Sequence, residues 1–268
     1  MAARKPRAHT ALITGASSGI GEALAKRFAR AGHRLVLVAR TRAKLQALAT
    51  LLAAEHGVAV SVRAVDLTRP DAPRRLASAL KRQGIHIDVL VNNAGVLHQG
   101  EFAAMRADRH QELINLNVAA LTAMLSHFLP GMIARGRGRV LNVASIAAFQ
   151  PVPMLATYAA TKAFVLSLSE SLAAELNGTG VTVTTLCPGI TDTHMLSSAV
   201  EANARLAGLP GFLVGDVEQV AEEGYRACME GEVIRVPGVV NQFVTLASRA
   251  TPKWLLRRIA GTLARRAG

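Results

Sequence analysis

The chain has 268 residues, of which 50% are hydrophobic and only 4% aromatic, and its formal net charge is +13. The length suits one large α/β domain, and no apolar run approaches the ~20 residues of a membrane span. The amino terminus lacks the apolar segment of a signal peptide, and the cysteines lack metal-ligand spacing. We therefore expect a cytoplasmic protein in which Cys187 and Cys228 are reduced thiols in or near the core.

The positive charge lies mainly at the two ends of the chain. Residues 1–10 carry three bases and no acid, and the stretch after Glu232 carries seven bases and no acid, which leaves +3 for residues 11–232. A nucleic-acid-binding domain would carry its basic patch on the folded body. We therefore do not expect nucleic acid as a partner.

Short runs of Val, Leu and Ile alternate with helical stretches. The expected strands lie at 11–14, 34–39, 58–65, 87–92, 138–144, 181–187 and 232–236. The expected helices lie at 19–31, 42–56, 70–83, 108–135, 154–177 and 216–230. Most of the strands are apolar on both faces, as in a parallel sheet between two layers of helices. The sequence predicts an α/β fold of the Rossmann type: a doubly wound sheet of seven mostly parallel strands, with helices on both faces and a C-terminal helical tail.

We expect one domain over residues 1–240 and a basic amphipathic tail over 241–268. The longest stretch without a clear element, about 189–215, follows a strand end where open α/β sheets bind ligands, and we expect it to form a lid. In the tail, Thr251-Pro252 is typical of a helix start. Two interpretations of this tail helix stay open. It docks on its own or a partner subunit, or it lies on an anionic membrane surface.

A glycine-rich loop, TGASSGIG at 14–21, joins the first expected strand to the first helix. The spacing of Gly15, Gly19 and Gly21 suits a dinucleotide, because glycines permit a tight turn and a close approach of phosphate to the backbone. The pyrophosphate would face the N–H groups of the helix N-terminus. Ser17 and Ser18 can donate further hydrogen bonds.

The end of the second strand indicates which nicotinamide cofactor is bound. An NAD site usually has an acid there, whereas this strand ends in Val38-Ala39-Arg40. A guanidinium suits the 2′-phosphate of NADP(H) through bidentate hydrogen bonds. We therefore expect NADP(H) in preference to NAD(H).

Further motifs follow in order: V-D-L at 65–67, N-N-A-G at 92–95, N-L-N-V at 115–118, N-V-A-S-I-A at 142–147, Y-x3-K at 158–162 and P-G with a threonine at 188–193. The ordered set resembles the classical short-chain dehydrogenase/reductase family over residues 10 to about 237. The resemblance implies an oxidoreductase, usually a homodimer or homotetramer. The catalytic set that it implies is Asn117, Ser145, Tyr158 and Lys162. The cofactor-binding residues that it implies are Gly15, Ser17, Ser18, Gly19, Ile20, Gly21, Arg40, Asp66, Leu67, Asn93, Ala94, Gly95, Tyr158, Lys162, Pro188, Gly189, Ile190 and Thr193.

The chemistry of the set follows from its residue types. When hydride reaches a carbonyl carbon, the carbonyl oxygen must gain a proton, and a tyrosine can supply it. Tyr158 and Lys162 share one helix face, so we expect the ammonium, together with the positive nicotinamide ring of the oxidised cofactor, to lower the tyrosine pKa from its usual ~10. Ser145 can stabilise the developing oxyanion. The resemblance implies that the Asn117 carbonyl holds a water of a proton relay.

The segments expected to line the substrate pocket, 96–98 and 149–155, are mostly apolar and offer no arginine for a carboxylate. This favours a lipophilic ketone, aldehyde or secondary alcohol. His98 and His194 are candidates for substrate contact, and the scattered histidines predict no metal site. The alternative function is a non-catalytic NADP(H)-binding sensor or membrane adaptor on the same fold. The presence of all four catalytic residues favours the enzyme.

Overall fold

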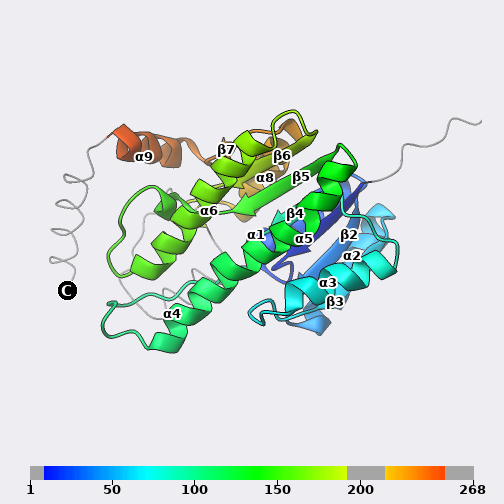
Figure 1. The fold of residues 1–268 in the computed structure, drawn as a ribbon, viewed down its shortest axis with the longest axis horizontal. Helices are drawn as coiled ribbons and strands as arrows, with labels where there is room; N and C mark the ends of the chain where they lie inside the picture. The colour runs from blue at the N-terminus through cyan, green and yellow to red at the C-terminus, as the bar shows by residue number, and fades with distance from the viewer. Residues whose placement is uncertain (1–8, 192–214, 251–268) are drawn as a thin grey trace, which may run out of the picture.

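The computed structural model describes residues 9–191 and 215–250. Seven strands form one sheet in the order β3-β2-β1-β4-β5-β6-β7, and every neighbouring pair is parallel (Figure 1). The strands are β1 Thr10–Thr14, β2 Arg34–Ala39, β3 Val60–Ala64, β4 Val89–Asn92, β5 Gly138–Val143, β6 Val181–Leu186 and β7 Ile234–Arg235. The predicted doubly wound sheet is confirmed, and it is parallel throughout.

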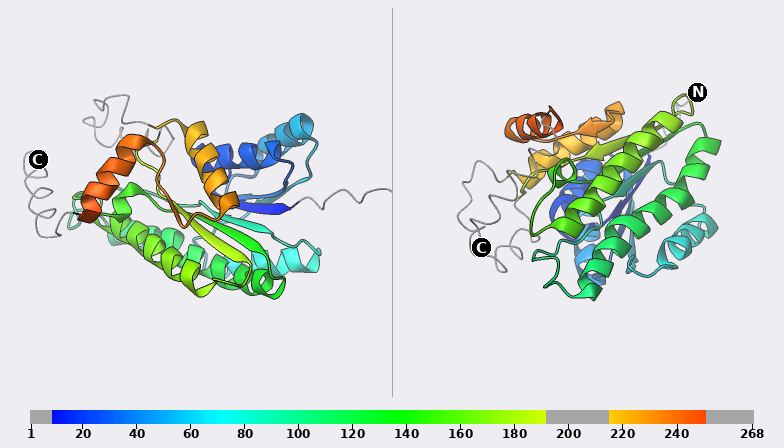
Figure 2. Two further views of the ribbon diagram at one scale, coloured as in Figure 1. Left: turned by 90° about the horizontal axis from the view of Figure 1, so that it is seen from above. Right: turned by 60° about the vertical axis from the view of Figure 1, so that its left-hand side comes forward.

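Helices cover both faces of the sheet (Figure 2). Helices α1 Gly19–Arg30, α2 Arg42–His56 and α8 Val217–Glu230 pack on one face, and α3 Ala72–Arg82, α5 Leu121–Ala134 and α6 Ala156–Glu175 pack on the other. Two apolar clusters fill the space between the layers. In β1, Leu12 packs in one cluster and its neighbour Ile13 packs in the other. Both faces of the strand are therefore buried, which is why the strand sequences are apolar without alternation.

The single helix expected over 108–135 is divided. It consists of α4 Ala107–Ile114, a π-helical turn η1 Asn115–Ala120, and α5. A π turn widens the helix by one residue and is common at functional sites. The whole stretch is long and apolar enough to cross a membrane by length and composition alone, and Leu113, Leu121 and Met124 within it are buried in the protein.

The carboxy-terminal part differs from the prediction. A helix α9, Val239–Ala250, already forms before the expected helix start at Thr251, and it lies at the edge of the molecule beyond β7 (Figure 1). Of the expected lid, only the two ends are described, and Thr191 pairs with Gly215 in an isolated parallel bridge. The rest of the lid and the tail helix lie outside the described residues. The domain boundary at residue 240 stays a prediction.

Candidate active site

The sequence-predicted site residues gather at the carboxyl ends of the strands around β1 and β4. The strand order reverses there, since β1 lies between β2 and β4. In open parallel sheets this reversal opens a crevice that binds ligands. The loops after β1, β4, β5 and β6 all reach this crevice.

The glycine loop between β1 and α1 has the expected geometry. Gly15 and Gly19 have φ values of +66° and +55°, which favour glycine. Gly21 leaves no room for a side chain, because a Cβ there would lie 2.2 Å from the Gly15 carbonyl oxygen. Ser18 is the N-cap of α1 in extended conformation and makes no side-chain capping hydrogen bond. The first N–H groups of α1 are therefore not capped by Ser18, and free N–H groups at a helix start favour an anion.

The loop after β4 braces the glycine loop. The carboxamide Nδ2 of Asn93 donates to the carbonyl oxygens of Thr14 (3.0 Å) and Gly15 (3.3 Å). The Thr14 hydroxyl accepts from the N–H groups of Asn93 and Ala94, both at 3.0 Å. Asn93, predicted to contact the cofactor, thus shapes the loop with its side chain. The sequence analysis missed Thr14, although it stands in the quoted motif.

Arg40 and Asp66 lie at the ends of β2 and β3, where the adenosine half of a dinucleotide would reach. Arg40 is exposed, and Leu67 beside Asp66 is buried. Burial alone would raise the Asp66 pKa, but the Thr68 hydrogen bonds and the charges of Arg40 and Arg69 hold that pKa below its usual value. Asp66 is therefore ionised at neutral pH, and Arg40 remains accessible.

The predicted proton donor, Tyr158, lies near the start of α6 and is buried. Burial raises its pKa, and a hydrogen bond with Ser145 lowers it only in part. In the protein alone the Tyr158 pKa is thus raised rather than lowered, because the loss of solvent outweighs the Ser145 hydrogen bond. The expected lowering by Lys162 together with an oxidised nicotinamide ring stays a prediction. Tyr158 is fully protonated at neutral pH, which is the form that a proton donor needs.

Lys162 lies one helical turn further along α6, and its Nζ is 5.7 Å from the centre of the Tyr158 ring. The Nζ donates to the Val143 carbonyl oxygen at the end of β5, at 2.9 Å. Burial lowers the Lys162 pKa to about 8, and nearby Cys187 raises it only in part. At neutral pH the side chain is still mostly cationic.

Asn117 lies in the π turn and joins three segments. Its Oδ1 accepts from the Val96 N–H (2.9 Å), and its Nδ2 donates to the Val96 carbonyl (3.0 Å) and to the Thr161 hydroxyl (3.1 Å). The Thr161 hydroxyl in turn donates to the Tyr158 carbonyl at 2.7 Å. Gly95 keeps this region tight, since a Cβ there would lie 3.1 Å from the Asn117 Oδ1 and 3.6 Å from the Lys162 Nζ. Thr161 thus links Asn117 to the tyrosine helix.

Tyr158 is surrounded by apolar side chains from the two expected pocket segments. A small cluster contains Leu113, Ala147, Tyr158 and Ala159, with Val96, Leu97, Val152 and Leu155 packed against it. The two segments also meet through the Gly100 N–H, which donates to the Met154 carbonyl at 2.9 Å. Met154 has a left-handed φ of 68° and a partly exposed side chain, so this loop carries local strain.

The turn after β6 closes this side of the crevice. The Pro188 carbonyl accepts from the Ile146 N–H at 3.0 Å, which ties the turn to the segment of Ser145. Gly189 lies against Asn241 of α9. The Ile190 carbonyl accepts from the Gly215 N–H at 2.7 Å, and the predicted cofactor contact Thr193 lies outside the described residues.

The candidate histidines have different outcomes. The Nε2 of His98 lies 2.9 Å from the Glu112 carboxylate on α4, so this imidazole is paired within the protein. His194 lies outside the described residues. A role of either residue in substrate contact stays a prediction.

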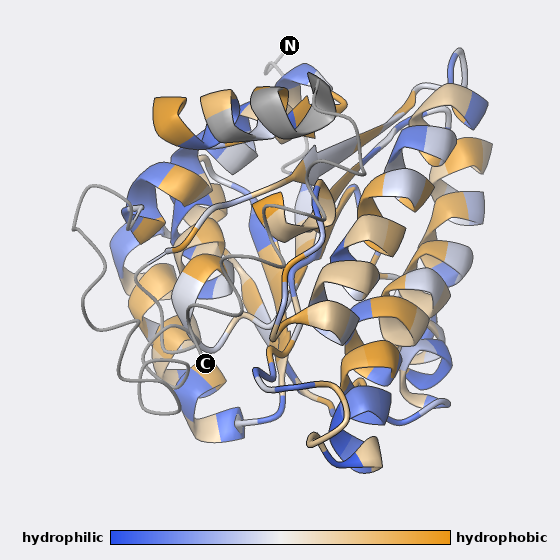
Figure 3. Cartoon of the chain, turned by 90° about the vertical axis from the view of Figure 1, so that its left-hand side faces the viewer, coloured by the Kyte–Doolittle hydropathy of each residue, from blue (hydrophilic) through white to orange (hydrophobic). Residues whose placement is uncertain are grey.

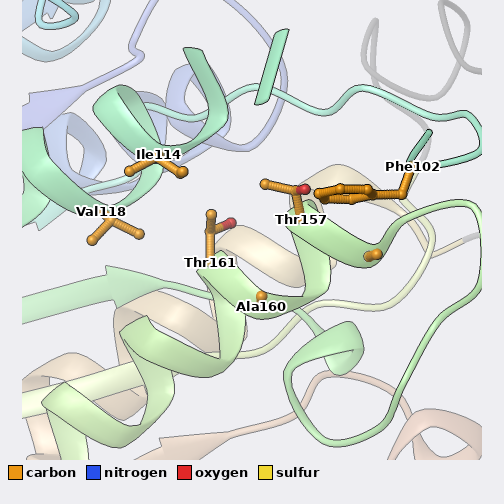
Figure 4. A pocket seen from close by; sticks show the side chains of 7 residues that line it. Phe102, Ile114, Val118, Thr157, Ala160 and Thr161 are labelled. Atoms are coloured by element: carbon orange, nitrogen blue, oxygen red, sulfur yellow. The ribbon is translucent and has the colours of Figure 1, made fainter. Parts of the chain in front are cut away.

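A separate groove of about 350 Å³ lies between α6 and the α4–η1 segment (Figure 4). Thr157 and Thr161 point into it from α6, opposite Ile114, Val118 and Phe102. Its lining includes neither Tyr158, Ser145 nor Lys162. The groove therefore borders the tyrosine helix without containing the predicted reacting groups.

Comparisons with known proteins agree with this arrangement. The sequence model of the short chain dehydrogenase family matches residues 9–204. A short chain dehydrogenase of Pseudocercospora fijiensis is 37% identical over 188 residues, which are 69% of this chain and 60% of that protein's length. The fold and the sequence together define the class, and the chain belongs to the short chain dehydrogenase family of oxidoreductases.

Solved structures of similar proteins extend over most of the chain. A short-chain dehydrogenase from Sphingobium yanoikuyae in complex with NADPH is 37% identical, with a TM-score of 0.80 over 89% of this chain and 92% of that one. A bulky-bulky ketone specific alcohol dehydrogenase from Comamonas testosteroni is 33% identical, with a TM-score of 0.77 over 90% of this chain and 92% of that one. The fold of this chain therefore has neighbours that include an NADPH-complexed enzyme.

Proposed function

We propose that the protein is an NADP(H)-dependent oxidoreductase that transfers hydride between the nicotinamide and a lipophilic ketone, aldehyde or secondary alcohol. The observation that carries the proposal is the environment of Tyr158. Its hydroxyl is hydrogen-bonded with Ser145 at the end of β5, the buried Lys162 lies beside its ring, and apolar side chains surround it. A proton donor beside a hydroxyl donor in apolar surroundings suits the reduction of an apolar carbonyl compound.

In this mechanism Tyr158 donates the proton that the carbonyl oxygen needs, and Ser145 donates a hydrogen bond that stabilises the negative charge on that oxygen. The Lys162 ammonium, fixed by the Val143 carbonyl, stabilises the tyrosinate that remains. Asn117 keeps the loop after β4 and the tyrosine helix at a fixed separation through Val96 and Thr161. In the oxidative direction the same groups act in reverse.

The residues present fit a nicotinamide dinucleotide. The left-handed Gly15 and Gly19, and the missing Cβ at Gly21, allow a pyrophosphate to approach the start of α1. The group would supply the hydride, and the residues that would bind it are those of the glycine loop, Asp66, Asn93 to Gly95, and the turn from Pro188. The exposed Arg40 at the end of β2 favours a 2′-phosphate and therefore NADP(H). The NADPH complex of the Sphingobium relative supports this preference.

A substrate panel tests the proposal. Lipophilic ketones, including bulky ones such as those named for the Comamonas relative, should be reduced with stoichiometric loss of NADPH. A small 2-keto acid of comparable reactivity should be a poor substrate, because no arginine stands in the expected pocket segments. An Arg40→Asp variant should lose about tenfold in NADPH affinity while NADH affinity holds or improves. If NADPH binds but no carbonyl compound is reduced, the non-catalytic sensor or adaptor is the correct reading.

We also propose a homo-oligomer. Three apolar side chains on helices α4, α5 and α6, Ile114, Ile133 and Phe164, are exposed on the described surface. Because single exposed apolar residues are normal on a protein surface, the proposal rests on the resemblance to a family whose members are usually homodimers or homotetramers. Light scattering on the purified protein should give a mass of two or four chains, and a monomer at micromolar concentration would contradict this.

A further inference from the structure

Helix α9 has the reverse polarity of a helix that packs on a core. Asn241 and Thr245, four residues apart, are turned toward the protein, where Thr245 is only 6% exposed. On the opposite side Val239, Phe243 and Leu246 are 66%, 69% and 65% exposed. At 3.6 residues per turn these three side chains form one stripe. Among the side chains of α9 that the structure describes, Asn241 and Thr245 thus face inward, and Val239, Phe243 and Leu246 face outward.

The first turn of α9 is firmly attached to the body of the protein. The Nδ2 of Asn241 donates to the Pro237 carbonyl (2.8 Å), and the Nε2 of Gln242 donates to the Val236 carbonyl (3.0 Å). Asn241 also fills the space above Gly189, where a Cβ would lie 2.5 Å from its Nδ2. The start of α9 is therefore held against the segment after β7, and its Asn241 lies directly beside the turn after β6 at the candidate active site.

The stripe is a continuous apolar surface at the outside of the fold. Figure 3 looks onto the side of the molecule that carries α9, where the first part of the helix includes hydrophobic residues at the edge of the fold. Three large side chains on one helix face, with a half-exposed Val240 next to them, exceed the scattered single apolar residues that are normal on a surface. Such a surface indicates a partner that offers an apolar environment.

The charge of the chain around α9 indicates which partner this is. From Val236 to the last residue given, the sequence contains no acid, and its bases are Arg249, Lys253, Arg257, Arg258, Arg265 and Arg266. A second copy docked on α9 would bring a second stretch of the same sign to the contact. An anionic lipid surface instead offers apolar chains for the stripe and negative headgroups for the bases.

We propose that α9 docks on the surface of an anionic phospholipid bilayer, with Val239, Phe243 and Leu246 inserted at the headgroup boundary, and that the acid-free basic sequence after Val236 accounts for the preference for anionic headgroups. The docked protein would hold the turn after β6, and with it the candidate active site, next to the membrane. A lipophilic substrate could then enter from the bilayer. The lipid contact itself does not depend on the proposed reaction.

Vesicle binding by the full-length protein tests this. At ~0.1 M salt, we expect the wild type to bind vesicles of phosphatidylcholine with about one third phosphatidylserine at least about tenfold more strongly than pure phosphatidylcholine vesicles. The double variant Phe243→Gln, Leu246→Gln should lose at least about tenfold in affinity for the anionic vesicles. The matched control Leu51→Gln changes an exposed leucine on α2 and should bind within about twofold of the wild type.

Two further measurements keep the result unambiguous. Because the altered side chains are exposed, the double variant should unfold at the same temperature as the wild type. NADPH consumption without vesicles should also be unchanged, so a failure of the proposed reaction is recognised separately. Equal binding to both kinds of vesicle, no binding by the wild type, or unchanged binding by the double variant would overturn the proposal. The proposal would also be overturned if the double variant had a smaller mass by light scattering than the wild type but still bound vesicles, because α9 would then contact a second copy of the chain.

Discussion

The glycine loop after β1 and the tyrosine helix α6 form the two sides of the candidate site, and they depend on different interactions. The loop depends mainly on backbone conformation, with left-handed φ values at Gly15 and Gly19, and the Asn93 side chain braces its carbonyl oxygens. The helix side is shaped by buried polar side chains, in which Lys162 bonds a carbonyl and Asn117 bonds Thr161. The glycine loop provides room and N–H groups for an anion, whereas helix α6 provides the Tyr158 proton and the Lys162 charge.

This difference predicts two kinds of failure. On the loop side an added methyl group is damaging because it collides with backbone that cannot move. On the helix side a change that keeps the shape but removes a hydroxyl or a charge is damaging, because a buried polar partner then loses its hydrogen bond. The two kinds of failure can be separated by variants of the loop that add only a methyl group and by variants of the helix that keep the side-chain shape but remove a hydroxyl group or a charge.

The largest effect is expected at Tyr158. Tyr158→Phe keeps the packing of the ring but removes the proton donor, so kcat with a good ketone should fall by about 10³-fold. NADPH affinity, measured by fluorescence titration, should stay within about twofold, because the glycine loop is untouched. Tyr225→Phe is the control, since Tyr225 lies away from the site beside His33. Turnover by Tyr158→Phe near the wild-type rate would refute the mechanism.

On the loop side, Gly21→Ala should act through collision alone. The new Cβ would lie 2.2 Å from the Gly15 carbonyl oxygen and 2.4 Å from the Asn93 Nδ2, so the loop must shift. A shift of this size should weaken NADPH binding by about 10²-fold.

Gly57→Ala is the control, because Gly57 has a left-handed φ of 65° but no atom within 4 Å of an added Cβ. It should cost about 1 kcal/mol of stability and leave NADPH binding unchanged. Equal losses in both variants would show that the loop effect is unspecific.

The buried cation on the helix side should make stability depend on pH. The Lys162 pKa is about 8 in the folded protein, against the usual 10.5. Between these values the unfolded chain carries the proton and the folded chain does not, so the free energy of unfolding rises with pH. Relative to Lys162→Met, the wild type should gain about 1.4 kcal/mol per pH unit between about pH 8 and about pH 10. Denaturant unfolding of both proteins across this range measures it, and a constant difference would contradict the lowered pKa.

The smallest effect is expected at Thr161, which acts through its neighbours. Thr161→Val keeps the side-chain shape but leaves the Asn117 Nδ2 without its hydroxyl acceptor, so kcat should fall by about tenfold. Thr161→Ser restores the hydroxyl and should recover activity to within about twofold of the wild type. The pH dependence of kcat should shift in the valine variant only, which a purely structural defect would not produce. If serine fails and valine works, the methyl group rather than the hydroxyl matters.

Much of the candidate site could be read from the sequence, because its key relations are local. The spacing of Gly15, Gly19 and Gly21 sets the shape of the loop, and the separation of four positions between Tyr158 and Lys162 places both on one helix face. The alternation of apolar runs and helices likewise predicted the sheet, since strands buried on both faces need apolar residues throughout.

The tertiary structure decided what depends on residues distant in the chain. The burial of Tyr158 raises its pKa in the protein alone, and Asn117 reaches Val96 and Thr161 only because the π turn, the loop after β4 and helix α6 meet. The inward face of α9 is set in the same way, by contact of Asn241 with the turn at Gly189. Sequence periodicity identifies an apolar stripe on a helix, but only packing against the rest of the chain determines whether that stripe is buried or faces outward.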